Sequence, residues 1–203
     1  MKKVLCFGDS NTYGFNPTNG KRYDASTRWT SILQELVGKK FKIIEAGCNN
    51  RTAFKINPEG IRQTGIEILP TYLLQNPDII IIALGTNDLQ TQYNITLEEY
   101  SDGLTQLITL AKDKKIILLT PTIITSAILD TFFNQLFDKN SIEKSKELPA
   151  IYEKIAKENQ CTLINSNDFI NGSTPDGLHY TPQEHKILAE VLANILLNEF
   201  QYL

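Results

Sequence analysis

Five short, almost entirely apolar runs alternate along the chain with segments whose apolar residues repeat at helical spacing, and this alternation limits the possible folds most. The runs are KVLCF (3–7), FKIIEA (41–46), DIIIIAL (78–84), KIILLT (115–120) and CTLIN (161–165). Runs this uniformly apolar are typical of strands buried on both faces, as in a parallel sheet. The order of the segments predicts βαβαβαβαβα, a three-layer α/β/α sandwich around a five-stranded parallel sheet.

The helical segments between these runs begin and end at recognisable signals. Apolar residues recur at helical spacing over 29–37 and stop at a glycine. Residues 96–99 (TLEE) and 181–184 (TPQE) have the Thr-x-x-Glu spacing of a capping box, so each is expected to begin a helix. Prolines interrupt two further helical patterns, around 60–75 and 142–158, and leave the extent of those helices open.

Size and charge limit the possible classes of function. The chain has 203 residues, of which 41% are hydrophobic, and this suits one domain spanning residues 1–203 with a sizeable core. Lys and Arg total 20 against 23 Asp and Glu, so the formal charge is -3. This balance gives no attraction to nucleic acid or to anionic lipid, and neither is expected as a partner. No apolar stretch approaches the ~20 residues of a membrane helix.

The cysteines indicate a reducing compartment. Cys6, Cys48 and Cys161 lie far apart and form no Cys-x-x-Cys pair, so neither a disulfide framework nor a zinc site is expected. The apolar run near the N-terminus is too short for the hydrophobic region of a signal peptide. We therefore expect a reduced cytoplasmic protein.

Polar residues follow the predicted strands, at the edge of a parallel sheet where ligands usually bind. Ser10 lies in the Gly-Asp-Ser turn after the first run, and its hydroxyl can act as a nucleophile only if a base takes its proton. His179 lies in the loop before the last helix, at the same edge, whereas His185 falls in the first turns of that helix and is expected to be solvated. We therefore expect His179 to be the base, with a structural loop histidine as the alternative.

The other groups that acyl transfer needs are available at this edge. Asp176 precedes His179 by three residues, so its carboxylate could reach the far imidazole nitrogen and fix the tautomer. Its alternative role is that of a turn residue in Pro-Asp-Gly. The Ser10 N–H, the Gly47 N–H and the Asn87 side-chain amide are candidate donors to an oxyanion. Because Gly and Asn are also ordinary turn residues, none of these donors indicates an oxyanion hole by itself. Only their occurrence together with Ser10 and His179 does so.

Together these residues resemble the SGNH hydrolases, also called GDSL esterases, whose motif blocks are named for Ser, Gly, Asn and His. The four blocks here are GDS (8–10), GCNNRT (47–52), GTND (85–88) and DGLH (176–179). The resemblance implies a flavodoxin-like sheet of order 2-1-3-4-5, with the catalytic triad and oxyanion hole made of the residues named above. It also implies a metal-independent serine esterase without a cofactor. The usual Leu after the serine is Asn11 here, a change expected to affect packing beneath the loop.

Three other kinds of protein fit the sequence less well. Residues 8–9 and 85–88 faintly resemble the Asp and Asn ligands of two-metal phosphoesterases, but such sites generally need several histidines and this chain has 2. The first run is followed by GDSNTYG and not by the G-x-G-x-x-G of dinucleotide-binding proteins. A non-catalytic binding domain would bind ligand without turnover and would not need the pair Asp176 and His179.

The substrate is less visible in the sequence. The candidates for substrate contact are Asp9, Tyr13, Trp29, Arg51 and Phe54. Each has a structural alternative, because aromatic side chains usually belong to a core, a loop arginine can bind neighbouring carbonyls, and an aspartate can cap a helix. We expect a small or medium acyl ester, hydrolysed through an acyl-enzyme. Carbohydrate O-acetyl esters are the main variant, and lysophospholipids and thioesters are alternatives.

One insertion, residues 121–140, is more apolar than a simple connection requires. It could cover the active site, join a second copy of the chain in a homo-oligomer, or pack against the body of the domain.

Overall fold

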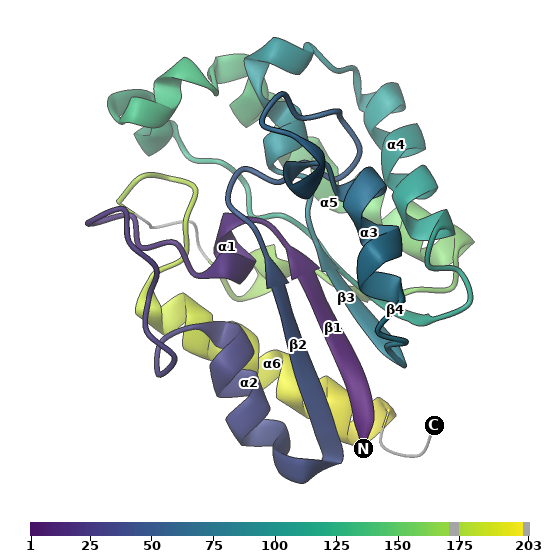
Figure 1. Cartoon of the computed structure of the whole chain (residues 1–203). Coiled ribbons are helices and arrows are strands. Elements are labelled where there is room, and N and C mark those ends of the chain that lie inside the picture. The colour runs from purple at the N-terminus through teal and green to yellow at the C-terminus, as the bar shows by residue number, and fades with distance from the viewer. Residues whose placement is uncertain (171–174, 201–203) are drawn as a thin grey trace.

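A five-stranded parallel sheet forms the centre of the computed structural model, which describes residues 1–170 and 175–200 (Figure 1). Its strands are β1 (Lys2–Gly8), β2 (Phe41–Gly47), β3 (Ile79–Ala83), β4 (Lys115–Leu119) and β5 (Thr162–Ile164). The sheet order is β2-β1-β3-β4-β5, which confirms the predicted order. Gly8 pairs with both Gly47 and Ala83, so β1, β2 and β3 end at the same level.

Helices cover both faces of this sheet, as the alternating pattern predicts. They are α1 (Ser10–Tyr13), α2 (Trp29–Val37), α3 (Gly65–Leu73), α4 (Leu97–Thr109), α5 (Lys139–Glu158) and α6 (Pro182–Glu199). The helices α2 and α6 pack together on one face, while α3, α4 and α5 cover the other (Figure 1).

The apolar runs are buried on both sides because successive side chains of a strand point to opposite faces. Val4 and Cys6 pack against α2 and α6, whereas Leu5 and Phe7 pack into the layer of α3, α4 and α5. All four side chains are fully buried. The same alternation holds in β3 and accounts for its run of four isoleucines.

The helix boundaries largely follow the sequence signals. Both predicted capping boxes are present, at the starts of α4 and α6. The two prolines, Pro70 and Pro149, lie inside α3 and α5, so these helices continue through them. Leu69 and Leu148 precede the prolines and are fully buried. Packing of these apolar faces therefore outweighs the missing proline hydrogen bonds.

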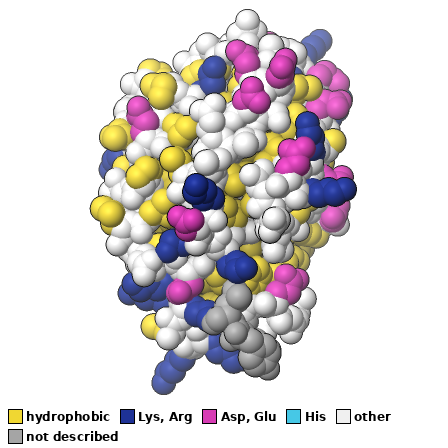
Figure 2. All heavy atoms as spheres, turned by 90° about the vertical axis from the view of Figure 1, so that its right-hand side faces the viewer, with side chains coloured by type: hydrophobic (Ala, Val, Ile, Leu, Met, Phe, Trp, Pro, Cys, Tyr) yellow, Lys and Arg dark blue, Asp and Glu magenta, His cyan; other side chains and the backbone are white. Residues whose placement is uncertain are grey.

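The surface carries charges of both signs. On the side of the molecule where α4 lies, acidic and basic side chains are interspersed with apolar ones (Figure 2). None of the helices in the described part of the chain is long and apolar enough to cross a membrane.

Candidate active site

A tight turn after β1 places Ser10 at the carboxyl edge of the sheet. Asp9 caps α1, because its Oδ1 accepts the Asn11 N–H at 2.9 Å. The helix ends after one turn at Gly14, whose φ of 86° lies in the left-handed region that glycine adopts readily. The N–H groups of Gly14 and Phe15 both donate to the Ser10 carbonyl. The backbone around Ser10 is thus held at both ends.

Ser10, His179 and Asp176 form a continuous chain of hydrogen bonds. His179 Nε2 lies 2.9 Å from Ser10 Oγ, and His179 Nδ1 lies 2.7 Å from Asp176 Oδ2. The other oxygen, Asp176 Oδ1, accepts the N–H groups of Leu178 and His179. Burial raises the pKa of Asp176, but the hydrogen bonds and charge of His179 outweigh burial and hold that pKa below its ordinary value. An ionised Asp176 therefore keeps the proton on Nδ1 and leaves Nε2 facing the serine.

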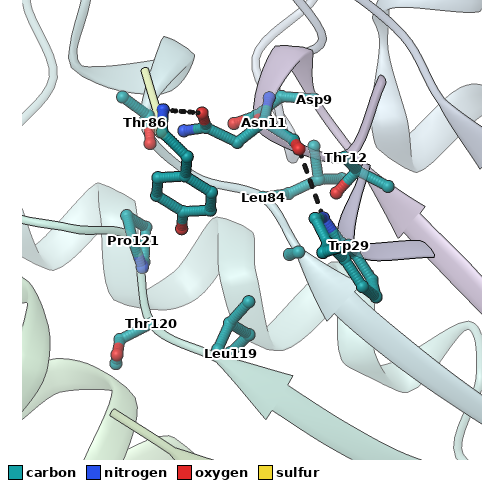
Figure 3. Close-up of a pocket in the computed structure, with 11 residues that line it drawn as sticks. Asp9, Asn11, Thr12, Trp29, Leu84, Thr86, Leu119, Thr120 and Pro121 are labelled. Atoms are coloured by element: carbon teal, nitrogen blue, oxygen red, sulfur yellow. Dashed lines mark hydrogen bonds between the residues drawn. The ribbon is translucent and has the colours of Figure 1, made fainter. Parts of the chain in front are cut away.

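Asn11, the residue after Ser10, connects α1 to the loop of the histidine. Its Nδ2 donates to the Leu178 carbonyl at 3.2 Å, and its Oδ1 accepts the Tyr180 N–H at 2.9 Å. Asn11 thus holds the backbone on both sides of His179. Its own carbonyl accepts the Trp29 indole N–H at 3.2 Å, as Figure 3 shows. With Asn in place of the family's usual leucine, this position makes a polar connection to the histidine loop.

Beside this turn lies a small cavity of about 10 Å³, bordered by Asp9, Asn11, Thr12 and Trp29 among others (Figure 3). That is about the space of one water molecule. Burial raises the pKa of Asp9 to about 6, although the Asn11 N–H and the charges of His179 and Arg51 act in the opposite direction. Asp9 and Trp29 therefore lie beside the catalytic turn and support it.

Asn87 lies after β3 with its side-chain amide held at both ends. Its Nδ2 donates to the Arg51 carbonyl at 3.0 Å, and its Oδ1 accepts from Gln90 Nε2 at 3.1 Å. One Nδ2 hydrogen remains for a further acceptor. The Ser10 N–H lies in the first turn of α1, where helix N–H groups have no intrahelical partner.

Gly47 does not occupy the predicted position of an oxyanion donor. The Cys48 N–H donates to the Gly8 carbonyl of β1, and successive N–H groups of a strand point in opposite directions. The Gly47 N–H therefore points away from β1 and from the serine that follows it. A Cβ at Gly47 would overlap the Tyr13 nitrogen, so this glycine allows α1 to pack closely on β2. Within the second block, Asn49 and Asn50 reach the pocket instead.

A pocket of about 170 Å³ opens beside Ser10 and His179. Its apolar lining residues are Phe15, Phe133, Leu136, Phe137 and Leu178. Asn49, Asn50, Glu59 and Asn87 are polar and line it as well. Glu59 carries no motif signal in the sequence, and only its position after the second block could have pointed to it.

The predicted substrate contacts lie elsewhere. Arg51 is 0% exposed, and its guanidinium donates to the carbonyls of Gly8, Ala46 and Arg62, which is the structural alternative left open by the sequence. Tyr13 stacks with Arg22. Phe54 packs on Tyr100, and neither Tyr13 nor Phe54 borders the pocket beside Ser10.

The prediction that His185 is solvated is wrong. Its side chain is 0% exposed and lies between the rings of Tyr23 and Tyr180. Its Nδ1 accepts the Trp29 N–H at 3.4 Å. Burial, followed by the charge of Arg28, lowers the pKa of His185 to about 3 and keeps the imidazole neutral. Its place on the inner face of α6 explains the burial, because that face packs against α2.

Asp88, from the same block as Asn87, supports the second-block loop. Its two carboxylate oxygens accept the N–H groups of Ala53, Phe54 and Lys55. Burial raises the pKa of Asp88 to about 6 despite these hydrogen bonds. Within residues 1–170 and 175–200, no three His, Cys, Asp or Glu side chains are grouped as metal ligands would be.

The insertion 121–140 lines part of the pocket and packs on the body of the domain. Phe133, Leu136 and Phe137 line the pocket, and Phe133 lies 5.3 Å from the His179 ring, between ring centroids. Ile128 is fully buried, whereas Phe132 is 72% exposed. Self-association through this segment stays a prediction.

Comparison with known proteins places these features among esterases. The family model described as GDSL-like lipase/acylhydrolase matches residues 4–192. A carbohydrate acetylesterase from Sinorhizobium meliloti is 28% identical with a TM-score of 0.92, over 98% of this chain and 100% of that one. An aryl esterase from M. smegmatis is 27% identical with a TM-score of 0.89, over 97% and 99% of the two chains.

Among curated proteins, the chain is similar to the N-acylneuraminate cytidylyltransferase of Streptococcus agalactiae serotype V. The two are 28% identical over 132 residues, which make up 62% of this chain. The aligned part spans 30% of that relative's length.

Proposed function

The chain belongs to the GDSL-like lipase/acylhydrolase family, and we propose that Ser10, His179 and Asp176 are the catalytic triad with which it hydrolyses ester bonds. Family and neighbours make it a serine hydrolase of the esterase class, as the sequence predicts. The observation that carries the triad is the unbroken hydrogen-bonded chain from Ser10 Oγ through His179 to Asp176, in which Ser10 and His179 line a partly apolar pocket.

In the proposed reaction, His179 Nε2 takes the Ser10 proton as Oγ attacks the ester carbonyl. Asp176 stabilises the imidazolium that forms. His179 then gives the proton to the leaving alcohol oxygen as the C–O bond breaks, and this produces an acyl-enzyme. A water molecule, deprotonated by the same nitrogen, hydrolyses the acyl-enzyme and restores Ser10.

The negative oxygen of the tetrahedral intermediate needs donors that are already in place. We assign this role to the Asn87 side-chain amide and the Ser10 N–H. Support comes from the fixed Asn87 amide and from its position with Ser10 on the wall of one pocket.

The pocket favours a small or medium acyl ester with a hydroxyl-rich alcohol. Its apolar residues would contact the acyl group, and Asn49, Asn50 and Glu59 would contact the alcohol. Carbohydrate O-acetyl esters fit this division, and one similar structure bears the name carbohydrate acetylesterase. Lysophospholipids and thioesters are the alternative substrates on the same scaffold.

A panel of p-nitrophenyl esters of increasing acyl length, assayed beside acetylated sugars, tests this assignment. We expect kcat/KM to be highest for short acyl groups and acetylated sugars to be hydrolysed. Highest kcat/KM for long acyl chains would favour the lysophospholipase alternative, and absence of turnover on every ester would remove the proposal.

We treat residues 1–203 as one catalytic domain, because one sheet supports all three triad residues. The cytoplasmic location rests on three cysteines that are all free thiols, in keeping with a reducing compartment.

A further inference from the structure

An oxyanion donor such as Asn87 has to present the correct end of its amide. The Nδ2 and Oδ1 ends have almost the same shape, yet only Nδ2 stabilises a negative oxygen. The hydrogen-bond partners of Asn87 therefore decide whether it assists catalysis. The Arg51 carbonyl can only accept, so it favours Nδ2 on its own side.

Gln90 fixes the other end of the Asn87 amide. Its Nε2 donates to Asn87 Oδ1 at 3.1 Å and to Asn50 Oδ1 at 2.7 Å. Both hydrogens of this nitrogen are then in use, and an amide nitrogen accepts no hydrogen bond. Gln90 is 1% exposed and its contact with Asn87 is buried, so water does not compete for Asn87 Oδ1 there. Its Oε1 accepts from Gln92 Nε2 at 2.8 Å, which fixes the direction of Gln90 itself.

The far end of this network is anchored by a carboxylate. Asn50 Nδ2 donates to Glu59 Oε1 at 2.5 Å. Because an ionised carboxylate accepts only, Asn50 must turn its Oδ1 toward Gln90. The Glu59 carboxylate and the Arg51 carbonyl, which only accept, therefore fix the orientations of three side-chain amides. These are the amides of Asn50, Gln90 and Asn87, and none of them can exchange its nitrogen and oxygen without losing a hydrogen bond.

We propose that Gln90 is a positioning residue that holds the Asn87 amide with its nitrogen toward the oxyanion, with Asn50 and Glu59 fixing the polarity of Gln90. This inference rests on the proposed function, since it gives Asn87 a donor's role. It adds a buried residue outside the triad and the oxyanion hole whose donor character, more than its shape, determines the rate.

Two substitutions separate donor character from shape. Gln90→Glu keeps the shape but replaces the donor by an acceptor, which repels Asn87 Oδ1 and draws Nδ2 away from the oxyanion. Gln90→Met removes the donor without adding an acceptor. We expect kcat to decrease in the order wild type, Gln90→Met, Gln90→Glu, with a loss of about tenfold or more for Gln90→Glu and little change in KM. A packing role predicts the reverse order for the two variants.

The pH profile gives a second readout. A carboxyl buried at position 90 has a raised pKa, and its protonated form can donate again to Asn87 Oδ1. The ratio of kcat for Gln90→Glu to that of wild type should therefore rise as the pH falls from about 9 to about 5. Gln135→Glu, the same change on an exposed residue in the segment that flanks the pocket, should show a constant ratio near one.

Binding of a boronic acid, which forms a tetrahedral adduct with the serine, should weaken in parallel with kcat in both Gln90 variants. If Gln90→Glu does not fold, the inference is judged on Gln90→Met by kcat and boronate affinity. Wild-type kcat in Gln90→Glu above neutral pH, or in Gln90→Met, overturns the inference. If Asn87→Ala itself keeps full activity, the proposed function is at fault and not only the role of Gln90.

Discussion

Among single residues, the two histidines show how position alone separates catalysis from structure. His179 contacts Ser10 and Asp176, whereas His185 is fully buried on the inner face of α6. We expect His179→Ala to lower kcat by about 10⁴-fold or more. His185→Gln should leave kcat close to the wild-type value but lower the melting temperature, because it disturbs a buried contact. Kinetics and thermal denaturation of both variants check this. Loss of activity in His185→Gln alone would contradict the assignment of the base.

Asp9 gives a prediction for stability because its pKa is about 6 in the folded protein and ~3.9 in an unfolded chain. The folded state binds this proton more tightly, so the contribution of Asp9 to stability is full below about pH 4. This contribution, at most about 3 kcal/mol, is lost as the pH rises from about 4 through about 6. Asp9→Asn keeps the oxygen that caps α1 and cannot ionise.

The melting temperature of Asp9→Asn minus that of wild type should therefore be more positive at about pH 8 than at about pH 4. Thermal denaturation at the two pH values measures this difference. A variant that loses more stability at the higher pH would mean that the folded protein favours ionised Asp9, through His179 and Arg51.

Not every residue role could be predicted from the sequence. Ser10, His179 and Asp176 follow from strand ends and the small number of histidines, and the structure brings them together. Arg51 and Gly47 could not be placed, because whether a loop side chain or N–H faces substrate depends on strand direction and packing. Gln90 carries no sequence signal, since a glutamine becomes informative only when its hydrogen-bond partners are known.

Between elements, the critical contact is that of α1 with the loop before α6. Asn11 bonds to Leu178 and Tyr180, on either side of His179. Asn11→Leu, which restores the family's usual residue, leaves a buried N–H and a buried carbonyl without this partner. We expect a kcat about tenfold lower and a loss of stability of about 2 kcal/mol, with KM little changed.

Asn11→Asp is the matched variant, because it keeps the acceptor for the Tyr180 N–H but places a carboxylate oxygen against the Leu178 carbonyl. Its kcat should also be lower than that of wild type, because these two oxygens repel each other. Steady-state kinetics and thermal denaturation of the two variants test the contact. Wild-type kcat in Asn11→Leu would show that the loop holds His179 without Asn11.

The positions of helices and strands could be predicted from the sequence wherever the signal lies within the element itself. The capping boxes fix the starts of α4 and α6, and the two-sided apolar runs fix the strands. The extent of α3 and α5 could not be predicted from the sequence. Pro70 and Pro149 lower the local helix propensity, but tertiary packing stabilises both helices across these prolines. The place of residues 121–140 also depends on packing, which puts Phe133 over the histidine.

In the whole molecule, the order of the strands brings the candidate catalytic residues together. The chain leaves β1 toward β2 and later returns on the other side of β1 to form β3, so the loops after these three strands meet at one edge. Ser10 and Asn87 follow β1 and β3, and Asn50 follows β2. Residues far apart in the sequence thereby line one pocket, and the family resemblance predicted this order before any contact was known.

Covalent labelling can establish whether Ser10 is the nucleophile of this pocket. Wild type and Ser10→Ala are treated with a fluorophosphonate, the labelled peptide is identified by mass spectrometry, and esterase activity is measured on the same samples after exhaustive EDTA treatment. We predict labelling of Ser10 alone in active, EDTA-treated wild type, and neither labelling nor turnover in Ser10→Ala. Labelling of another serine, wild-type turnover in Ser10→Ala, or activity that returns only with added metal would contradict the account.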